Sequence, residues 1–488
     1  MRLFIRFMRV THKVLGTLLS VLFLMWFISG IVMIYKRFPN VNRIIHKYQI
    51  SLPDSLPQIG VLSKVISDSA KIKTLSVEML RETPVIKVVT DAGKFTLSAD
   101  TLLQEVKDSV SYADIEAYAK RWANGDILRV DTLRQLEQWI PMSSYRSHFP
   151  IYKFIYNDPE KSYLYVSSTT GKALQFVTRS DRFWGWVGPI PHFIYFWQLR
   201  QDAKLWNSVV SWLSGLGAIM CFAGIIMGIY SYAIVWKRRK RFRSPYKKWD
   251  FKWHHITGFF FGFFVFMFIL SGFMSLNDLP KWFMKEEDNT LSERLFKEEP
   301  LTLGEINSDY RAILAAYPGE VKGISFKKYE DHLFYGVRTS EKELTLDIID
   351  GVVKPLNLTK DEVEVKMSKV LKYSYSMSLM TEYDNYYVGR SERDPLPVYR
   401  VEVEDNDKTV LYVSPETGRT RYYTARSRAE RWIYPIFHTF RIKFFAEHPV
   451  LREVFLWIIL LGGIIVSFTG VVLGLKYLKR LFTRKKKR

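Results

Sequence analysis

The chain has 488 residues, of which 48% are hydrophobic, 16% aromatic and 25% charged, and its formal net charge is +22. This mixture favours apolar membrane spans beside soluble domains. The single cysteine, Cys221, excludes intramolecular disulfides, covalent haem attachment through a cysteine pair, and iron–sulfur or zinc clusters held by cysteines. Nucleic acid is not an expected partner, because nearly all of the excess charge lies in three basic segments at 2–13, 237–252 and 476–488.

Four stretches contain no Asp, Glu, Lys or Arg, namely 14–35, 205–236, 253–277 and 454–475. Each reaches the roughly 20 residues that an α-helix needs to cross a bilayer. A buried helix of a soluble protein can be equally apolar, but four such stretches beside basic clusters favour a multi-pass membrane protein. Basic segments stay on the cytoplasmic side. We therefore expect both termini on the cytoplasmic side, an uncleaved first span, and both long intervening segments outside.

The expected fold is a helical four-span bundle that carries two extracytoplasmic α+β domains. Residues alternate as strands should at Val85–Val89 and Phe95–Leu97, and Ile115–Trp122 is typical of an amphipathic helix. In chain order we expect a cytoplasmic N-terminus with the first span at 1–36, the first outer domain at 37–204, the second span at 205–236, a basic cytoplasmic loop at 237–252, the third span at 253–277, the second outer domain at 278–453, the fourth span at 454–475 and a basic cytoplasmic tail at 476–488.

An internal duplication is visible in the pattern W-x2-P-x2-H, which occurs twice, 246 residues apart. Its matched residues are Trp186, Pro189 and His192 in the first copy and Trp432, Pro435 and His438 in the second, followed at equal distances by Gly217, Gly224 and Gly228 and by Gly463, Gly470 and Gly474. The first helix of each half matches too, at an offset of 242 residues: His12-x3-Gly16 corresponds to His254-x3-Gly258, and Ser29-Gly30 to Ser271-Gly272. Both halves enter from the cytoplasm, so we expect parallel repeats related by a pseudo-twofold axis along the membrane normal.

The ends of the outer segments carry a family resemblance. Leu164–Ser167 followed by Thr170-Gly171, and Leu411–Ser414 followed by Thr417-Gly418, indicate a strand, a turn and a second strand. Together with an Arg-x3-Trp, the following His, and a helix opened by His-x3-Gly, this pattern resembles the PepSY-associated transmembrane-helix family over nearly the whole chain. The resemblance implies two PepSY-like outer domains. Some similar proteins are inner-membrane ferrisiderophore reductases with b-type haem between their helices, others are known only as iron-regulated membrane proteins, and soluble PepSY domains inhibit proteases.

Four matched histidines are the candidate cofactor ligands. His12 and His254 lie at the cytoplasmic ends of the first and third spans, whereas His192 and His438 lie on the outer side, just before the second and fourth. A twofold axis would bring like histidines face to face, and each pair could then hold one haem b by its iron. Ligation by two imidazoles suits electron transfer rather than oxygen chemistry. The alternative for each ring is a hydrogen-bonding role at the membrane interface.

Other residues near these pairs have more than one interpretation. His255 competes with His254, and His448 is a second-rank ligand candidate; His46, His148 and His332 are typical of surface residues. Arg182 and Arg428, four residues before each matched Trp, could hold haem propionates or lipid phosphate, or could anchor the interface. The glycines at 16, 258, 224 and 470 either make room for a macrocycle or serve plain helix packing.

The sequence favours a membrane reductase with two b-type haems. Electrons from a separate donor, such as a protein, a quinol or free flavin, would pass to a ferric siderophore or other ferric chelate held outside. The alternative is a non-enzymatic membrane protein whose PepSY domains bind or restrain an extracytoplasmic protease or envelope partner. A permease for iron chelates is weaker, since the spans lack buried charges and proline breaks. The sequence leaves open the chelate, the donor and the oligomeric state.

Overall fold

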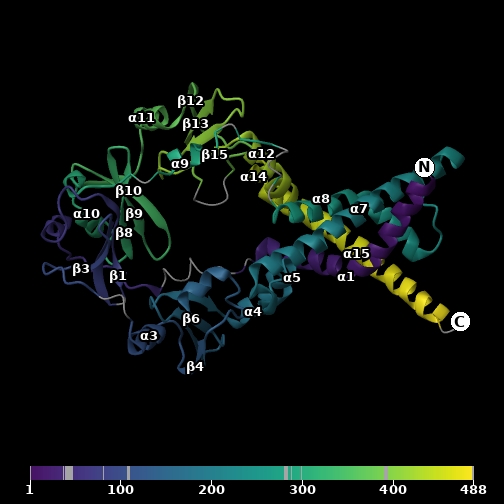
Figure 1. The fold of residues 1–488 in the computed structure, drawn as a ribbon, viewed down its shortest axis with the longest axis horizontal. Coiled ribbons are helices and arrows are strands. Elements are labelled where there is room, and N and C mark those ends of the chain that lie inside the picture. The colour runs from purple at the N-terminus through teal and green to yellow at the C-terminus, as the bar shows by residue number, and fades with distance from the viewer. Residues whose placement is uncertain are drawn as a thin grey trace.

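The computed structural model describes residues 2–36, 38, 48–80, 82–106, 110–277, 279, 284–286, 288–297, 299–388 and 394–485. Four long helices lie together at one end of the molecule and three sheets at the other, as Figure 1 shows. Short helices lie between the two parts. The chain crosses from one part to the other four times, so each half contributes two long helices and one set of strands.

The four long helices are α1 (Arg2–Tyr35), α7 (Ala203–Arg239), α8 (Trp249–Met274) and α15 (Pro449–Lys485). Each is long and apolar enough to cross a membrane, and each contains one of the four expected spans apart from a few residues at the ends. Helices α1 and α8 each pack against both α7 and α15. The first helix of each half therefore lies diagonally opposite its counterpart across the bundle. Helix α8 begins four residues before the expected third span, because charged residues that precede the apolar stretch form its first turn. It ends at Met274.

The largest sheet has seven strands in the order β11-β10-β9-β8-β1-β2-β3. Its strands are β1 (Ile72–Leu80), β2 (Thr83–Thr90), β3 (Lys94–Ser98), β8 (Gly323–Tyr329), β9 (His332–Arg338), β10 (Glu343–Ile349) and β11 (Val352–Pro355). Strands from the two halves of the chain meet at its centre, where β1 pairs antiparallel with β8 and Leu75 lies opposite Phe326. Both halves also contribute side chains to one hydrophobic core beneath this sheet.

Two four-stranded antiparallel sheets flank the shared sheet, one from each half. The first comprises β4 (Ile127–Leu133), β5 (Ile151–Tyr156), β6 (Tyr163–Ser167) and β7 (Ala173–Val177), and the second β12 (Tyr375–Met380), β13 (Val398–Val403), β14 (Val410–Val413) and β15 (Thr420–Tyr423). The hairpins expected from the Thr-Gly turns are present as β6–β7 and β14–β15. Helix α3 (Tyr112–Ala119) covers the first sheet and α11 (Lys360–Val370) the second, each beginning at a hydroxyl cap with a reciprocal carboxylate.

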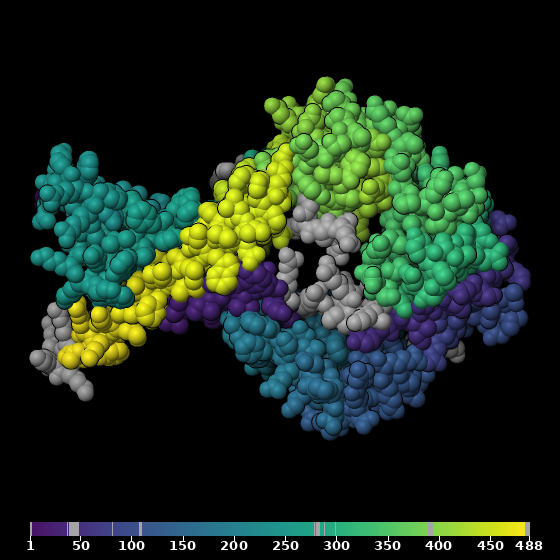
Figure 2. All heavy atoms as spheres, turned by 180° about the vertical axis from the view of Figure 1, so that it is seen from behind, coloured from purple at the N-terminus to yellow at the C-terminus, as the bar shows by residue number. Residues whose placement is uncertain are grey.

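The part of the molecule that holds the sheets is less divided than the sequence suggested, because the segments 37–204 and 278–453 share the seven-stranded sheet. An isolated β1 or β8 would expose a row of unpaired backbone N–H and C=O groups, and pairing the two strands removes both edges. Viewed as a solid from behind, the part that holds the sheets is hollowed between the shared sheet and the ends of the long helices (Figure 2).

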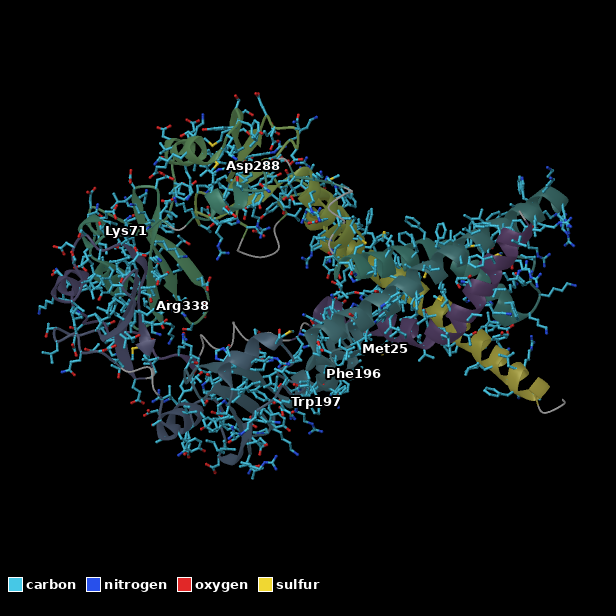
Figure 3. The ribbon with its side chains drawn as sticks, in the orientation of Figure 1. Met25, Lys71, Phe196, Trp197, Asp288 and Arg338 are labelled. Carbon is cyan, nitrogen blue, oxygen red and sulfur yellow. The ribbon has the colours of Figure 1, made fainter. Side chains whose placement is uncertain are left out.

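Short helices join the sheets to the bundle. In the first half these are α4 (Arg179–Val187), α5 (Pro189–Phe193) and α6 (Trp197–Arg200); in the second they are α12 (Ala425–Arg431), the π-helical turn η4 (Trp432–Ile436), α13 (Phe437–Thr439) and α14 (Lys443–Glu447). Phe196 and Trp197 mark the first junction in Figure 3. The remaining elements are η1 (Ile59–Lys64), η2 (Ser143–His148), α9 (Leu291–Leu295), η3 (Leu303–Glu305) and α10 (Arg311–Ala316).

Candidate haem-ligand pairs

His192 and His438, at the end of the bundle next to the sheets, meet across the two repeats and are called the outer pair; His12 and His254, at the other end, are called the inner pair. His192 lies in the last turn of α5 and His438 in α13, and their ring centroids are 6.2 Å apart. Each short helix stops at a residue in the left-handed conformation, Ile194 (φ 53°) in the first repeat and Phe440 (φ 51°) in the second. This reversal turns the chain back toward the next long helix and leaves the imidazole facing the bundle axis.

One nitrogen of each outer ring has a hydrogen-bond partner that assigns its tautomer. Nδ1 of His192 lies 3.2 Å from the hydroxyl of Ser29, and Nδ1 of His438 lies 3.0 Å from the hydroxyl of Ser271. Each hydroxyl donates its own hydrogen to the carbonyl three residues earlier, so it must accept from the ring. The ring hydrogen therefore sits on Nδ1, and Nε2 keeps the lone pair that binds a metal.

The inner pair has the same hydrogen-bond arrangement, in which Nδ1 of each ring donates to an acceptor. His12 on α1 and His254 on α8 have ring centroids 6.0 Å apart. Nδ1 of His12 lies 2.9 Å from the carbonyl oxygen of Met220, and Nδ1 of His254 lies 3.2 Å from that of Val466 and 3.0 Å from the hydroxyl of Thr469. A carbonyl only accepts, so both rings donate from Nδ1 and present Nε2 as the ligand nitrogen. Met220 and Val466 are 246 residues apart, the offset of the duplication.

The spacing of both pairs fits two imidazoles on one metal. A bond from a metal to an imidazole nitrogen is about 2 Å, and the ring centroid lies about 1 Å behind that nitrogen, so two rings on opposite sides of one ion have centroids about 6 Å apart. The angle between ring planes is free, because each ring can rotate about its own metal bond. Two imidazole nitrogens alone would not complete the ligand set of an iron ion, so each pair would suit a metal carried in a larger cofactor such as haem. Within the described ranges, no group of three or more His, Cys, Asp or Glu side chains gathers to hold a bare ion.

A cavity of about 590 Å³ opens at the outer pair. Both outer imidazoles line it, together with apolar side chains such as Trp26, Phe27 and Phe268. Its size lies in the range of cofactor pockets, which are mostly apolar with a few polar groups. Two guanidinium groups complete the lining, from Arg441 and Arg452, both in the second repeat.

Glycines make room for the rings themselves. A Cβ atom at Gly224 would lie 2.7 Å from Cε1 of His12, closer than any ordinary contact, and one at the matched Gly470 would lie 3.6 Å from Cε1 of His254. The other matched pair behaves differently. A Cβ at Gly16 would meet only the sulfur of Met220 at 3.7 Å, and one at position 258 would meet nothing within 4 Å.

Arg182 and Arg428 are not brought to the outer pair. Arg182 donates to the carbonyl of Val177 and its guanidinium lies over the ring of Tyr163, 3.9 Å from the centroid. Arg428 donates to three carbonyl oxygens of the β13–β14 turn and of β15. Neither side chain lines the outer cavity. Each arginine instead ties its short helix to the neighbouring sheet. The residues that reach the cavity come later in the chain.

The remaining histidines lie elsewhere. His255 contacts the rings of Tyr232 and Tyr246, with centroids 4.5 Å and 5.2 Å away, rather than joining the inner pair. His448 bonds through Nδ1 to a carbonyl one turn earlier. His148 contacts a serine hydroxyl of β6, His332 lies between two carboxylates of the shared sheet and α11, and the expectation for His46 lies outside the described residues.

Sequence reasoning missed Arg441 and Arg452. Their matched positions in the first repeat are Tyr195 and Trp206, which also line the cavity. A comparison of the two repeats at the offset of 246 residues would have found them, as positions where one repeat has an aromatic residue and the other has an arginine. The serines of the outer pair had such a signal, since Ser29-Gly30 and Ser271-Gly272 match in register.

Comparison with known proteins finds a family model that matches part of the chain. No curated protein matches the chain. The family model described as the PepSY-associated TM region matches residues 98–300, from the end of β3 through α7 and α8 to the segment after α9. The chain thus carries a PepSY-associated TM region over residues 98–300, and the match bears out the resemblance over that part of the sequence.

Proposed function

We propose that the protein is a transmembrane electron carrier that holds two b-type haems, one at each histidine pair, and reduces a ferric chelate, such as a ferric siderophore, on the outer side. The observation that carries this proposal is the pair of matched imidazole couples, each with centroids about 6 Å apart and with Nδ1 already donating. A single couple at one end of the bundle could equally be two interface histidines that only form hydrogen bonds. Two couples built from matched residues of a duplicated chain favour two equivalent cofactors.

The residues of the chain would hold and orient the cofactors. His12 and His254 would supply Nε2 ligands near the cytoplasmic side, and His192 and His438 would do so near the outer side. Arg441 and Arg452 bring positive charge to the cavity, which suits the carboxylates of a porphyrin, and Arg452 is held in place by donating through Nε and Nη2 to the carbonyl of Thr439. A haem with both axial positions filled by imidazole supplies one-electron transfer rather than oxygen chemistry.

Two sites at opposite ends of the bundle favour transfer across the membrane. Electrons would enter near the inner pair from a separate donor, such as a protein, a quinol or free flavin, and leave near the outer pair. Reduction of Fe(III) to Fe(II) weakens its binding to hard oxygen ligands and would release iron from the chelate outside the cytoplasmic membrane.

Absorption spectra and haem counts of the purified protein test this function, with matched controls in the chain. The wild type should contain two haems per chain and show a Soret band that shifts on reduction by dithionite. His254→Ala and His438→Ala should each lose one haem, whereas the neighbouring changes His255→Ala and His448→Ala should keep both. A colourless protein, or unchanged haem content in both ligand variants, would refute the proposal and favour a PepSY domain protein that binds an envelope partner.

A further inference from the structure

We propose that the electron leaves through the second repeat alone, by way of Tyr434, to an anionic, oxygen-rich ferric chelate bound in a polar pocket beside His438. This inference rests on the proposed function and adds the place of the acceptor. The pocket is about 640 Å³ in size and lies between the end of α8, strand β15 and the short elements α12 and η4.

Tyr434 connects the two sites. Its side chain lines both the outer cavity and this second pocket. Its ring is stacked on that of His438, with centroids 5.2 Å apart and planes inclined by 28°. A single aromatic side chain thus contacts the ligand imidazole on one side and the second pocket on the other. The π-helical turn that carries Tyr434 also fits this role, since such turns occur frequently at functional sites.

The duplication is broken at this position. Tyr434 corresponds to Gly188 in the first repeat, where a Cβ atom would lie 2.7 Å from Cγ1 of Val32 and no side chain fits. Arg431 corresponds to Gly185, whose added Cβ would lie 3.0 Å from the ring of Trp139. The first repeat therefore fills the matching place with an apolar core, whereas the second keeps a polar pocket there.

The lining of the pocket indicates the chemistry of its ligand. Its charged side chains are two guanidiniums, Arg421 and Arg431, and one carboxylate, Glu430, and hydroxyl groups from β15 and α12 add further donors. Arg421 is paired with Asp394 and Glu430 with Arg426, so this charged group keeps one net positive charge, that of Arg431. Arg431 is largely buried and donates to a backbone carbonyl, and Arg421 pairs with an aspartate at 2.6 Å, so both guanidiniums are held in place. Fixed guanidiniums suit carboxylate oxygens. We therefore expect a hydroxycarboxylate chelate such as ferric citrate.

The step is a one-electron transfer. Fe(III) in the chelate gains one electron and becomes Fe(II), and no bond within the chelate is made or broken in the transfer. The outer site loses one electron and is replenished from the cytoplasmic donor through the inner site. Protein groups need only hold the chelate close to Tyr434 and keep its anionic oxygens paired.

Gallium citrate tests the pocket without any redox step, because Ga(III) resembles Fe(III) in charge and is not reduced. Titration calorimetry on the full chain in nanodiscs should show binding to the wild type. Ile433→Trp, which fills the pocket, should weaken it about tenfold or more, as the loss of a buried ligand site implies. The matched change Val187→Trp in the first repeat should leave it unaltered. Glu430→Gln removes the opposing charge and should strengthen binding, so the two pocket variants move in opposite directions.

Electron transfer is measured by mixing dithionite-reduced protein with ferric citrate and following reoxidation by absorbance. At ferric citrate concentrations that saturate each variant, Tyr434→Leu should slow reoxidation about tenfold or more, because the aromatic bridge is lost and a change in affinity no longer limits the rate. No binding of gallium citrate to the wild type, or equal binding to the Ile433→Trp variant, would overturn the pocket. Wild-type reoxidation of the Tyr434→Leu variant would overturn the bridge. A protein without haem would fail the proposed function separately, and the calorimetry would still decide the pocket.

Discussion

The change Gly224→Ala tests the inner pair by adding a single carbon atom beside the ring of His12. The added Cβ would lie 2.7 Å from Cε1 and 2.9 Å from Nδ1 of His12, whereas carbon atoms prefer separations of about 3.5–4.0 Å. The ring must therefore retreat by roughly 1 Å, which breaks its 2.9 Å hydrogen bond to the carbonyl of Met220. Overpacking costs about 1–3 kcal/mol. If that cost falls on the ligated state, haem affinity at the inner site drops by roughly 5- to 150-fold.

The matched change Gly470→Ala is the control, because its added Cβ would meet Cε1 of His254 at 3.6 Å and Cβ of Ser20 at 3.5 Å, both ordinary contacts. A haem count by absorbance, after dilution to a concentration near the dissociation constant, measures the difference between the two variants. Gly224→Ala should lose the inner haem and keep the outer one, and Gly470→Ala should keep both. Equal behaviour of the two variants would show that ring placement does not govern the inner site.

Three further changes test the outer pair and the shared sheet. Ser29→Ala removes the acceptor of one outer Nδ1–H and should weaken outer haem binding by about 1 kcal/mol, seen as earlier haem loss on heating. Burial disfavours the charged form of His332, but hydrogen bonds to Glu362 and Asp347 outweigh it and raise its pKa. The stabilisation of the folded state by protonated His332 is complete below pH 6.5 and is lost as the pH rises through the raised pKa. His332→Gln should therefore flatten the pH dependence of Tm in that range. Burial opposes the charge of Glu78, but basic partners lower its pKa to about 2, so its stabilisation is present above pH 4.5 and lost toward pH 2; Glu78→Gln should remove that acid-side loss in circular dichroism melts.

Much of the candidate site could be found from the sequence because its residues occur at matched positions in both repeats. Matched histidines at constant offsets, combined with a twofold axis, place His12 near His254 and His192 near His438, and the structure brings both couples to about 6 Å. The spans were equally accessible, since a charge-free stretch of sufficient length has few alternatives in a membrane protein. Both inferences depend on local pattern and symmetry, and neither needs the details of tertiary packing.

Features that depend on long-range pairing were not accessible. The alternation of residues in β1 shows that it is a strand but cannot show that its neighbour is β8, about 250 residues later, since any exposed strand edge satisfies the same backbone groups. Arg182 and Arg428 were candidates for holding haem propionates or lipid phosphate, or for anchoring the interface, because a guanidinium matches either anion. The chain turns between them and the cavity, and Arg441 and Arg452, beyond that turn, line it instead.

The shared sheet and the two histidine couples all join the same two halves of the chain. Across the join of the sheet, Glu78 on β1 accepts from Arg338 on β9 at 2.7 Å, with Arg338 marked in Figure 3. Each imidazole takes its Nδ1 acceptor from its own half but meets its partner from the other, so neither half alone contains a complete site. A symmetric pair of separate halves could form both couples. It could not place Tyr434 on one side and Gly188 on the other, because identical halves carry identical residues. Fusion into one chain therefore permits the two repeats to differ at this position, which the proposed single exit route requires.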